Sequence, residues 1–395
     1  MRITKILIIS VIFLSGVSCS GDKLIPEPEQ HVKHVLPNAG LKDLVGIIRP
    51  DFLFGSFADG LTSPDKSRLR DIFRKEFSII TIGVYMKPLQ PQSGVYNFTA
   101  VDDLVYFSQA NDIVIYMHPL IGGYQYTADW VQYGNFTADQ LKQIMKERIE
   151  TILTRYTGKV KYVDVVNEAL IGSDPSGTIL WRTDKNVWIK MGWHDDVDGR
   201  WPLYLEEAFR IAREAGGSSV KLIYNDNLNA MMDSKRTQAT IRLYNDFKNA
   251  GIPVDGIGLQ FHCGVKYGQL REGSSGDGLV IDFDSFVQNL RRFGENGIEV
   301  HITEFDVHLP ENPTVNDYEM QAMAYREALK RCLEEPACKS FKSWGFTDKY
   351  AWKPLNYNAH QLIYDEEFNQ KRAYMEIRKM LEEKVLEIDS SYLSK

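Results

Sequence analysis

Eight short runs rich in β-branched and aromatic residues recur along this chain, and a longer stretch separates each run from the next. The runs, which we predict to be strands, cover residues 52–57, 77–82, 113–117, 162–166, 220–224, 256–259, 299–302 and 341–345. Apolar residues spaced near 3.6 predict helices between them, including 138–156, 203–215, 235–249, 283–295, 318–334 and 371–385. Strands that alternate with helices form parallel sheets, and eight such repeats predict a (β/α)8 barrel, the TIM barrel.

The repeats run from residue 41 to 388 without an evident linker, which is the length of one barrel domain. An open, doubly wound sheet is the alternative, but no Gly-rich phosphate turn follows the first predicted strand. The formal net charge is −7 and no stretch is strongly basic, so nucleic acid is not an expected partner. In a barrel the functional side chains follow the carboxyl ends of the strands, so we search for a site there.

The first 18 residues have the pattern of a signal peptide, and their end resembles that of a bacterial lipoprotein. Arg2 and Lys5 precede an apolar run over 6–17, which is too short to span a bilayer and leads to Cys19. We expect cleavage before Cys19 and lipidation of that cysteine, which would anchor an exported protein at the outer membrane or cell surface. Ordinary cleavage, giving a periplasmic or secreted protein, is the alternative. Residues 19–40 would then form a tether, and residues 389–395 a short tail.

Besides Cys19, three cysteines follow this leader. Cys332 and Cys338 lie six residues apart, with Pro336 between them to turn the chain. Because an exported protein meets an oxidising compartment, we expect these two to form a disulfide. Cys263 has no evident activating neighbour in the sequence, so we expect a buried, unreactive thiol.

Two predicted strands end in a glutamate: the fourth reads into Asn167-Glu168 and the seventh into Thr303-Glu304. A single glutamate at a strand end is commonly a solvated charge, but two at one mouth of a barrel can face the same substrate. Hydrolysis of a glycosidic bond needs a carboxylic acid for the leaving oxygen and a carboxylate for the anomeric carbon. The pair therefore predicts a glycoside hydrolase.

The segments 164–169 and 302–306 resemble the acid/base and nucleophile signatures of glycoside hydrolase family 10, the retaining endo-β-1,4-xylanase family. Other segments resemble the family in the same order, namely 85–87, 94–98, 221–226, 255–262 and 344–348 with Trp352, and so does the position of the Cys332 and Cys338 pair. The resemblance covers about residues 45–382. It implies a retaining, endo-acting enzyme on β-1,4-xylan or a related decorated β-glycan, with this polysaccharide as its partner.

The resemblance also implies a role for each matching residue. Glu168 would be the general acid/base, Glu304 the nucleophile, and Asn167 the partner of the sugar 2-hydroxyl. His262 and Asp306 would form a relay that orients the nucleophile and keeps it ionised. The sugar-binding residues would be Lys87, His118, Gln260, Asn225, Trp344 and Trp352.

The sequence departs from the family pattern on the glycone side, which holds the sugars on the non-reducing side of the cleaved bond. Gly83 and Val84 stand in place of two polar sugar-binding residues, and Gly122 and Gly123 in place of a tryptophan and a histidine; after the fifth strand, Asn227 replaces an aromatic residue. We expect these changes to favour a decorated or different β-linked glycan over plain xylan.

The insertion 192–201 adds aromatic residues that we expect beside the substrate. No metal or cofactor is expected, because no His/Cys/Asp cluster has ligand spacing and the acidic run 195–199 lacks the closing glutamate of a calcium loop. A glycan-binding protein without turnover, or a β-glycanase of other sugar specificity, is the alternative function. No particular oligomeric state is predicted.

Overall fold

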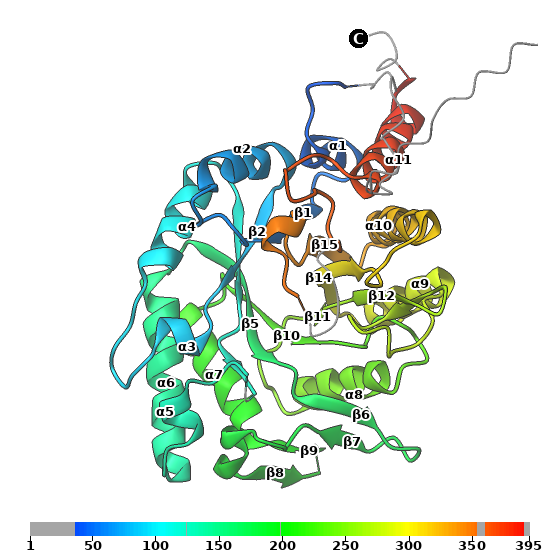
Figure 1. Ribbon diagram of the computed structural model, residues 1–395. Helices are drawn as coiled ribbons and strands as arrows, with labels where there is room; N and C mark the ends of the chain where they lie inside the picture. Colours follow the sequence, from blue (N-terminus) through cyan, green and yellow to red (C-terminus); the bar gives the residue numbers. More distant parts are fainter. Residues whose placement is uncertain (1–35, 124, 198, 354–359, 391–395) are drawn as a thin grey trace, which may run out of the picture.

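A closed barrel of parallel strands forms the centre of the protein (Figure 1). The computed structural model describes residues 36–123, 125–197, 199–353 and 360–390. The barrel strands are β1 (Leu53–Phe57), β2 (Ile79–Gly83), β3 (Val114–His118), β5 (Val160–Asn167), β10 (Lys221–Asp226), β11 (Gly256–Leu259), β14 (Glu299–His308) and β15 (Cys338–Ser343). Each pairs in parallel with the next, and β15 closes on β1, where Phe54 lies opposite Phe341. The predicted single-domain (β/α)8 barrel is confirmed.

Long helices cover the outside of the barrel. They are α2 (Lys66–Glu76), α4 (Thr99–Gln109), α6 (Ala138–Arg155), α7 (Leu203–Gly216), α8 (Lys235–Asn249), α9 (Phe283–Glu295), α10 (Val315–Glu334) and α11 (Arg372–Ile388). Capping side chains fix where some of them begin: Thr137 accepts a hydrogen bond from the Gln140 N–H, and the Gln140 side chain accepts one from the Thr137 N–H. Thr314 and Asp317 form the same reciprocal pair at the start of α10.

The strands are buried on both faces, because helices cover the outside and side chains fill the inside. Every residue of β5 except Lys161 is buried. Ile79, Tyr116, Tyr162 and Ile223 form a separate apolar cluster in the barrel interior. Lys342 is also fully buried there, with its Nζ 3.8 Å from the centre of the Tyr116 ring, and burial lowers the pKa of Lys342 to about 7. The barrel is therefore a packed core, and a cavity can form only at its mouth.

Short elements in the loops extend this framework. β4 (Ile121–Gly122) lies parallel to β5, β12 (His262–Lys266) lies parallel to β14, and β13 (Gln269–Glu272) pairs antiparallel with β12. Two hairpins follow β5, namely β6 (Leu170–Ser173) with β7 (Ile179–Trp181) and β8 (Trp193–Asp196) with β9 (Gly199–Pro202). The short helices are α3 (Met86–Leu89), α5 (Asp129–Gln132), η1 (Val187–Met191) and η2 (Asp348–Tyr350).

The insertion 192–201 does not lie where we predicted. Trp201 is fully buried, stacks on His194 with ring centroids 4.0 Å apart, and packs edge-on against Phe247 of α8. Trp193 is covered by the guanidinium of Arg200, 4.3 Å from the ring centre. The prediction was wrong because these aromatic side chains are buried within their own hairpin and against the outer helices. No described residue of the insertion lines the substrate cleft described below.

Helix α1 (Leu41–Ile48) lies at the amino end of the barrel, where it packs against β1 and α2. Arg49 directly follows α1 and donates to the carbonyl oxygens of Glu335 at 3.0 Å and Pro336 at 3.1 Å, just before β15. The helix also packs on α11, the last helix of the chain (Figure 1). The predicted signal peptide, Cys19, and most of the predicted tether and tail lie outside the described residues. Among the described residues, no helix is both long and apolar enough to cross a bilayer.

All three cysteines in the described part of the chain are free and buried. Cys332 lies in the last turn of α10 and Cys338 begins β15, and burial together with a hydrogen bond between the two thiols raises the pKa of Cys332. The predicted disulfide is therefore not formed in this structure, although its two sulfurs are neighbours. Cys263 donates to the Phe261 carbonyl oxygen at 3.3 Å, and burial raises the pKa of its thiol, as expected for an unreactive cysteine.

Candidate active site

Glu304 is buried in the carboxyl half of β14, with 4% of its surface exposed. Its Oε1 accepts a 2.7 Å hydrogen bond from Asn225 Nδ2 on β10, and its Oε2 lies 3.1 Å from His262 Nε2 on β12. Thr303 donates to Asn225 Oδ1 at 2.8 Å, which turns the amide N–H of Asn225 toward Glu304. Both carboxylate oxygens have a donor, so the side chain is held in one orientation.

A charged relay lies behind Glu304. His262 Nδ1 is 2.9 Å from Asp306 Oδ1, and the other oxygen of Asp306 is 3.1 Å from His308 Nε2. Burial opposes a charge on His262, but Asp306 and Glu304 outweigh it and raise the pKa of His262 to about 10. Burial likewise favours a neutral Asp306, but His262 and His308 lower its pKa to about 2. His262 is therefore charged at neutral pH, and it presents this charge to Glu304 across the 3.1 Å contact.

The same relay offers the donor atoms of a metal site. His262, Asp306 and His308 place ring nitrogens and a carboxylate oxygen within 4.8 Å of one another. However, His262 Nδ1 and Asp306 Oδ1 lie 2.9 Å apart in a charge-assisted hydrogen bond, whose proton takes the place that a cation would need. The other Asp306 oxygen forms an ion pair with His308 Nε2 at 3.1 Å. The geometry fits a proton-holding relay that orients Glu304.

Glu168 follows β5 directly and has a left-handed backbone, with φ of 57°. This conformation costs energy for any residue except glycine, and such residues cluster at functional sites. The Glu168 Oε1 atom accepts hydrogen bonds from Gln260 Nε2 at 3.0 Å and from the Tyr126 hydroxyl at 3.3 Å, and Oε2 accepts one from Gln125 Nε2 at 3.4 Å. The side chain is half-buried and its partners come mainly from loops.

A continuous chain of hydrogen bonds joins the two carboxyl groups. Asn225, which donates to Glu304, also donates to Asn167 Oδ1 at 3.0 Å. Gln260 Nε2 lies 3.2 Å from the same Asn167 oxygen and 3.0 Å from Glu168. The Asn167 Nδ2 atom makes no hydrogen bond to any described residue, although it is buried. Its N–H groups are therefore available to a ligand hydroxyl between the two glutamates.

Both glutamates line one cleft of about 600 Å³. The other lining residues are Phe57, Asp59, Tyr85, Gln125, Tyr126, Asn227, Gln260, His262, Ser274, Trp344 and Trp352. Trp344 stacks on Phe57 with ring centroids 4.3 Å apart, and Trp352 is 46% exposed. Asp59 is a third acidic residue in the cleft, and burial raises its pKa to about 7. Aromatic faces beside a few convergent polar groups suit a sugar chain.

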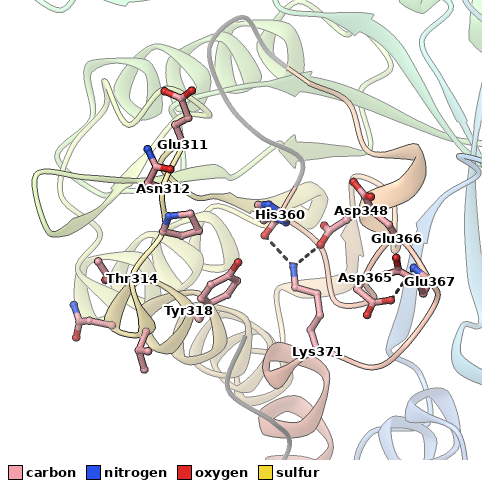
Figure 2. A pocket seen from close by; sticks show the side chains of 13 residues that line it. Glu311, Asn312, Thr314, Tyr318, Asp348, His360, Asp365, Glu366, Glu367 and Lys371 are labelled. Atoms are coloured by element: carbon pink, nitrogen blue, oxygen red, sulfur yellow. Dashed lines mark hydrogen bonds and ion pairs between the residues drawn. The ribbon is translucent and has the colours of Figure 1, made fainter. Parts of the chain in front are cut away.

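A larger hollow of about 820 Å³ lies between the loops after β14 and β15 (Figure 2). Five of its thirteen lining residues are acidic, and Lys371 also lines it (Figure 2). The Lys371 Nζ is already engaged by Asp348 at 2.7 Å and by the His360 carbonyl oxygen at 2.9 Å. Neither Glu168 nor Glu304 lines this hollow, so the chemistry belongs to the smaller cleft.

A comparison with protein families also indicates a glycoside hydrolase. The family described as Glycosyl hydrolase family 10 matches residues 44–380. This chain belongs to that family. Endo-1,4-beta-xylanase B of Thermotoga neapolitana is similar to it, at 31% identity over 329 residues that cover 82% of this chain and 86% of that protein. Xylanase 10B of Thermotoga petrophila RKU-1, solved in complex with xylobiose, has a TM-score of 0.73 at 30% identity and covers 88% of this chain and 98% of its own.

Within this family 10 barrel, most of the predicted site residues converge on the cleft. They are Glu168, Glu304, His262, Asp306, Asn167, Gln260, Asn225, Trp344 and Trp352. His118 lies beneath them and is buried, with Nδ1 2.7 Å from Asp164 and 3.8 Å from Glu304. Lys87 is not brought into the group: its Nζ pairs with Asp129 at 3.2 Å, and it does not line the cleft.

Sequence reasoning missed Gln125 and Tyr126, which reach Glu168 from the loop after β3. The glycines just before them were the available clue. A Cβ atom on Gly122 would lie 2.5 Å from the Tyr126 ring, so the glycine makes room for this tyrosine.

Proposed function

We propose that this family 10 glycoside hydrolase is an endo-acting, retaining enzyme on β-1,4-xylan or a related decorated β-glycan. The observation that carries the proposal is the pair of glutamates joined by one hydrogen-bond chain in one cleft. The relative named endo-1,4-beta-xylanase B and the xylanase 10B structure that holds xylobiose support xylan as the substrate class.

The residues divide the reaction into two displacements. In the first, the Glu304 carboxylate attacks the anomeric carbon while protonated Glu168 gives its proton to the leaving glycosidic oxygen. The bond to the leaving sugar breaks, and a glycosyl ester forms on Glu304. In the second, Glu168 takes a proton from water, whose oxygen attacks the same carbon and releases the ester. Each displacement inverts the carbon, so the product retains the β configuration.

The free N–H groups of Asn167 supply a contact for the sugar between the two glutamates. A donor at this position would bond to the 2-hydroxyl, and that bond strengthens as positive charge develops on the ring. Trp344 and Trp352 offer aromatic surface to neighbouring sugars.

The stereochemistry of the first product tests the mechanism. Xylohexaose and a panel of plant and algal polysaccharides would be digested while NMR follows the newly formed anomers. We expect the β anomer to appear first, with the α anomer growing only by mutarotation. The α anomer as first product would overturn the role of Glu304. Tight binding of these glycans without any product would instead favour a glycan-binding protein, the second candidate.

A preference for decorated glycans is part of the proposal, because the glycone-side polar groups at positions 83 and 84 are absent. Equal kcat/KM on xylohexaose and on every decorated xylan would contradict this preference.

We also propose that the chain is exported, cleaved before Cys19 and lipidated there, and that Cys332 and Cys338 form a disulfide in the oxidising compartment. The apolar leader and the neighbouring thiols support this. Mass spectrometry of the mature protein should find diacylglycerol on Cys19 and a peptide pair lighter by two hydrogens. A mature protein with an intact leader, or with both thiols free in denaturant, would contradict one part or the other.

A further inference from the structure

A second, smaller pocket opens beside the acid/base. It has a volume of about 220 Å³ and is lined by Gly123, Gln125, Tyr126, Glu168, Arg182, Asp184 and Lys185. Three of these residues, Gln125, Tyr126 and Glu168, also line the main cleft, so the two spaces meet at Glu168. We call this space the side pocket. Clefts that hold a drug-sized ligand measure about 300–1,000 Å³, so the side pocket suits a single sugar unit rather than a length of chain.

Arg182 is the unusual residue of the side pocket. It is half-buried, yet its guanidinium donates no hydrogen bond and forms no ion pair with any described residue, and its Nε atom is fully buried without a partner. The residue itself is fixed in place, because its N–H donates to the Ala169 carbonyl oxygen at 2.8 Å. By contrast, the buried Arg148 donates to the Leu120 carbonyl oxygen at 2.8 Å and also to that of Val84.

An arginine with free donors in a pocket is a ready partner for a carboxylate. The guanidinium is a planar fork that matches the two oxygens of a carboxylate, and an unpaired buried donor gains from any ligand that satisfies it. Asp184 lines the same pocket but forms no ion pair with Arg182. When Glu168 is protonated, as the first displacement requires, two cationic side chains of this pocket face one carboxylate. The electrostatics at that moment favour an anionic group.

We propose that the side pocket binds an acidic sugar branching from the β-1,4-linked backbone, with the branch carboxylate held by Arg182. This inference rests on the proposed function, since Glu168 marks the cleaved bond and the pocket adjoins it. A branch on a backbone sugar next to that bond can enter the pocket, whereas a neutral branch has no charge to offer Arg182. The protein is then selective for uronic-acid-decorated xylan among decorated glycans.

Steady-state kinetics on three matched xylo-oligosaccharides test the proposal: one unbranched, one with a single glucuronic acid branch and one with a single arabinose branch. Arg182→Gln should lower kcat/KM on the acid-branched substrate about 10- to 100-fold, the size of a lost charge-assisted hydrogen bond pair, and change the other two less than about threefold. Arg182→Lys keeps the positive charge but lacks the planar guanidinium, so its kcat/KM on the acid-branched substrate should lie between those of wild type and Arg182→Gln. Reducing the branch carboxyl to an alcohol should remove the wild-type preference.

Arg200→Gln is the matched control, because Arg200 belongs to the same loop between β5 and α7 but lines neither the cleft nor the side pocket. We expect it to leave all three rates unchanged, and thermal melting to show that every variant is folded. Equal losses of Arg182→Gln on all three substrates would mean that Arg182 positions Glu168, which overturns the proposal. Wild-type protein that cleaves the unbranched substrate but does not prefer the acid branch overturns only this inference. No cleavage of any substrate overturns the proposed function itself.

Discussion

The two glutamates of the cleft are held in opposite ways. Glu304 is 4% exposed and fixed by strand residues at 2.7 Å and 3.1 Å, with a charged histidine behind it. Glu168 is half-buried on a left-handed backbone, and its partners Gln260, Tyr126 and Gln125 stand at 3.0–3.4 Å. A rigid, positively charged environment suits a nucleophile, which must stay ionised. A group that must give a proton and take one back needs weaker partners that tolerate both of its forms.

Removing Glu304, the rigidly held glutamate, should have the largest effect on activity. Glu304→Ala should lower turnover of every substrate on the order of 10⁵-fold, because no covalent intermediate can form. Rates on xylan and on an aryl xyloside would be measured, with circular dichroism to show that the barrel is folded. Residual activity above about a thousandth of wild type would show that Glu304 is not the nucleophile.

Removing Glu168, the more loosely held glutamate, should lower the cleavage rates of different substrates unequally. Glu168→Ala should reduce polysaccharide cleavage about 10²- to 10⁴-fold, because a poor leaving group needs the proton. Release of a good leaving group such as dinitrophenolate should be far less affected in the first step. Pre-steady-state rates on both substrates would separate the two displacements. Losses of equal size would undo the assignment of Glu168 as the acid.

The relay behind Glu304 should make stability depend on pH. The pKa of His262 is raised from 6.5 to about 10, so its contribution is complete below pH 6.5 and is lost as the pH rises through 10. The pKa of Asp306 is lowered from 3.8 to about 2, so its contribution is complete above pH 3.8 and is lost as the pH falls toward 2. The Tm advantage of wild type over His262→Asn should therefore be largest near pH 4–6.5 and shrink toward pH 10. An advantage that is constant between pH 6 and 10 would refute a charged His262.

The smallest effect on activity is expected at Tyr126, which donates a hydrogen bond to Glu168 from a loop. Tyr126→Phe removes one 3.3 Å hydrogen bond and should lower kcat/KM about two- to fivefold. Tyr106→Phe, on the exposed face of α4, is the control and should leave kcat/KM unchanged. A loss as large as that of Glu168→Ala would mean that Tyr126 has a catalytic role of its own.

The barrel and its strand-end glutamates could be predicted from the sequence because both are periodic or local features. The strand runs alternate with helices along the chain, Glu168 directly follows β5, and Glu304 lies in the carboxyl half of β14. The prediction failed where a side chain's surroundings come from distant segments. The aromatic residues around Trp201 are typical of sugar binding, but their apolar surface is buried against α8, which lies 34 or more residues further on. Arg182 gives no sequence pattern at all, because its significance is the absence of a partner in three dimensions.

Helix α1 and its neighbour Arg49 lie at the amino end of the barrel, whereas both glutamates stand toward the carboxyl ends of their strands. Any attachment made through the residues that precede α1 would therefore join the barrel on the side away from the cleft.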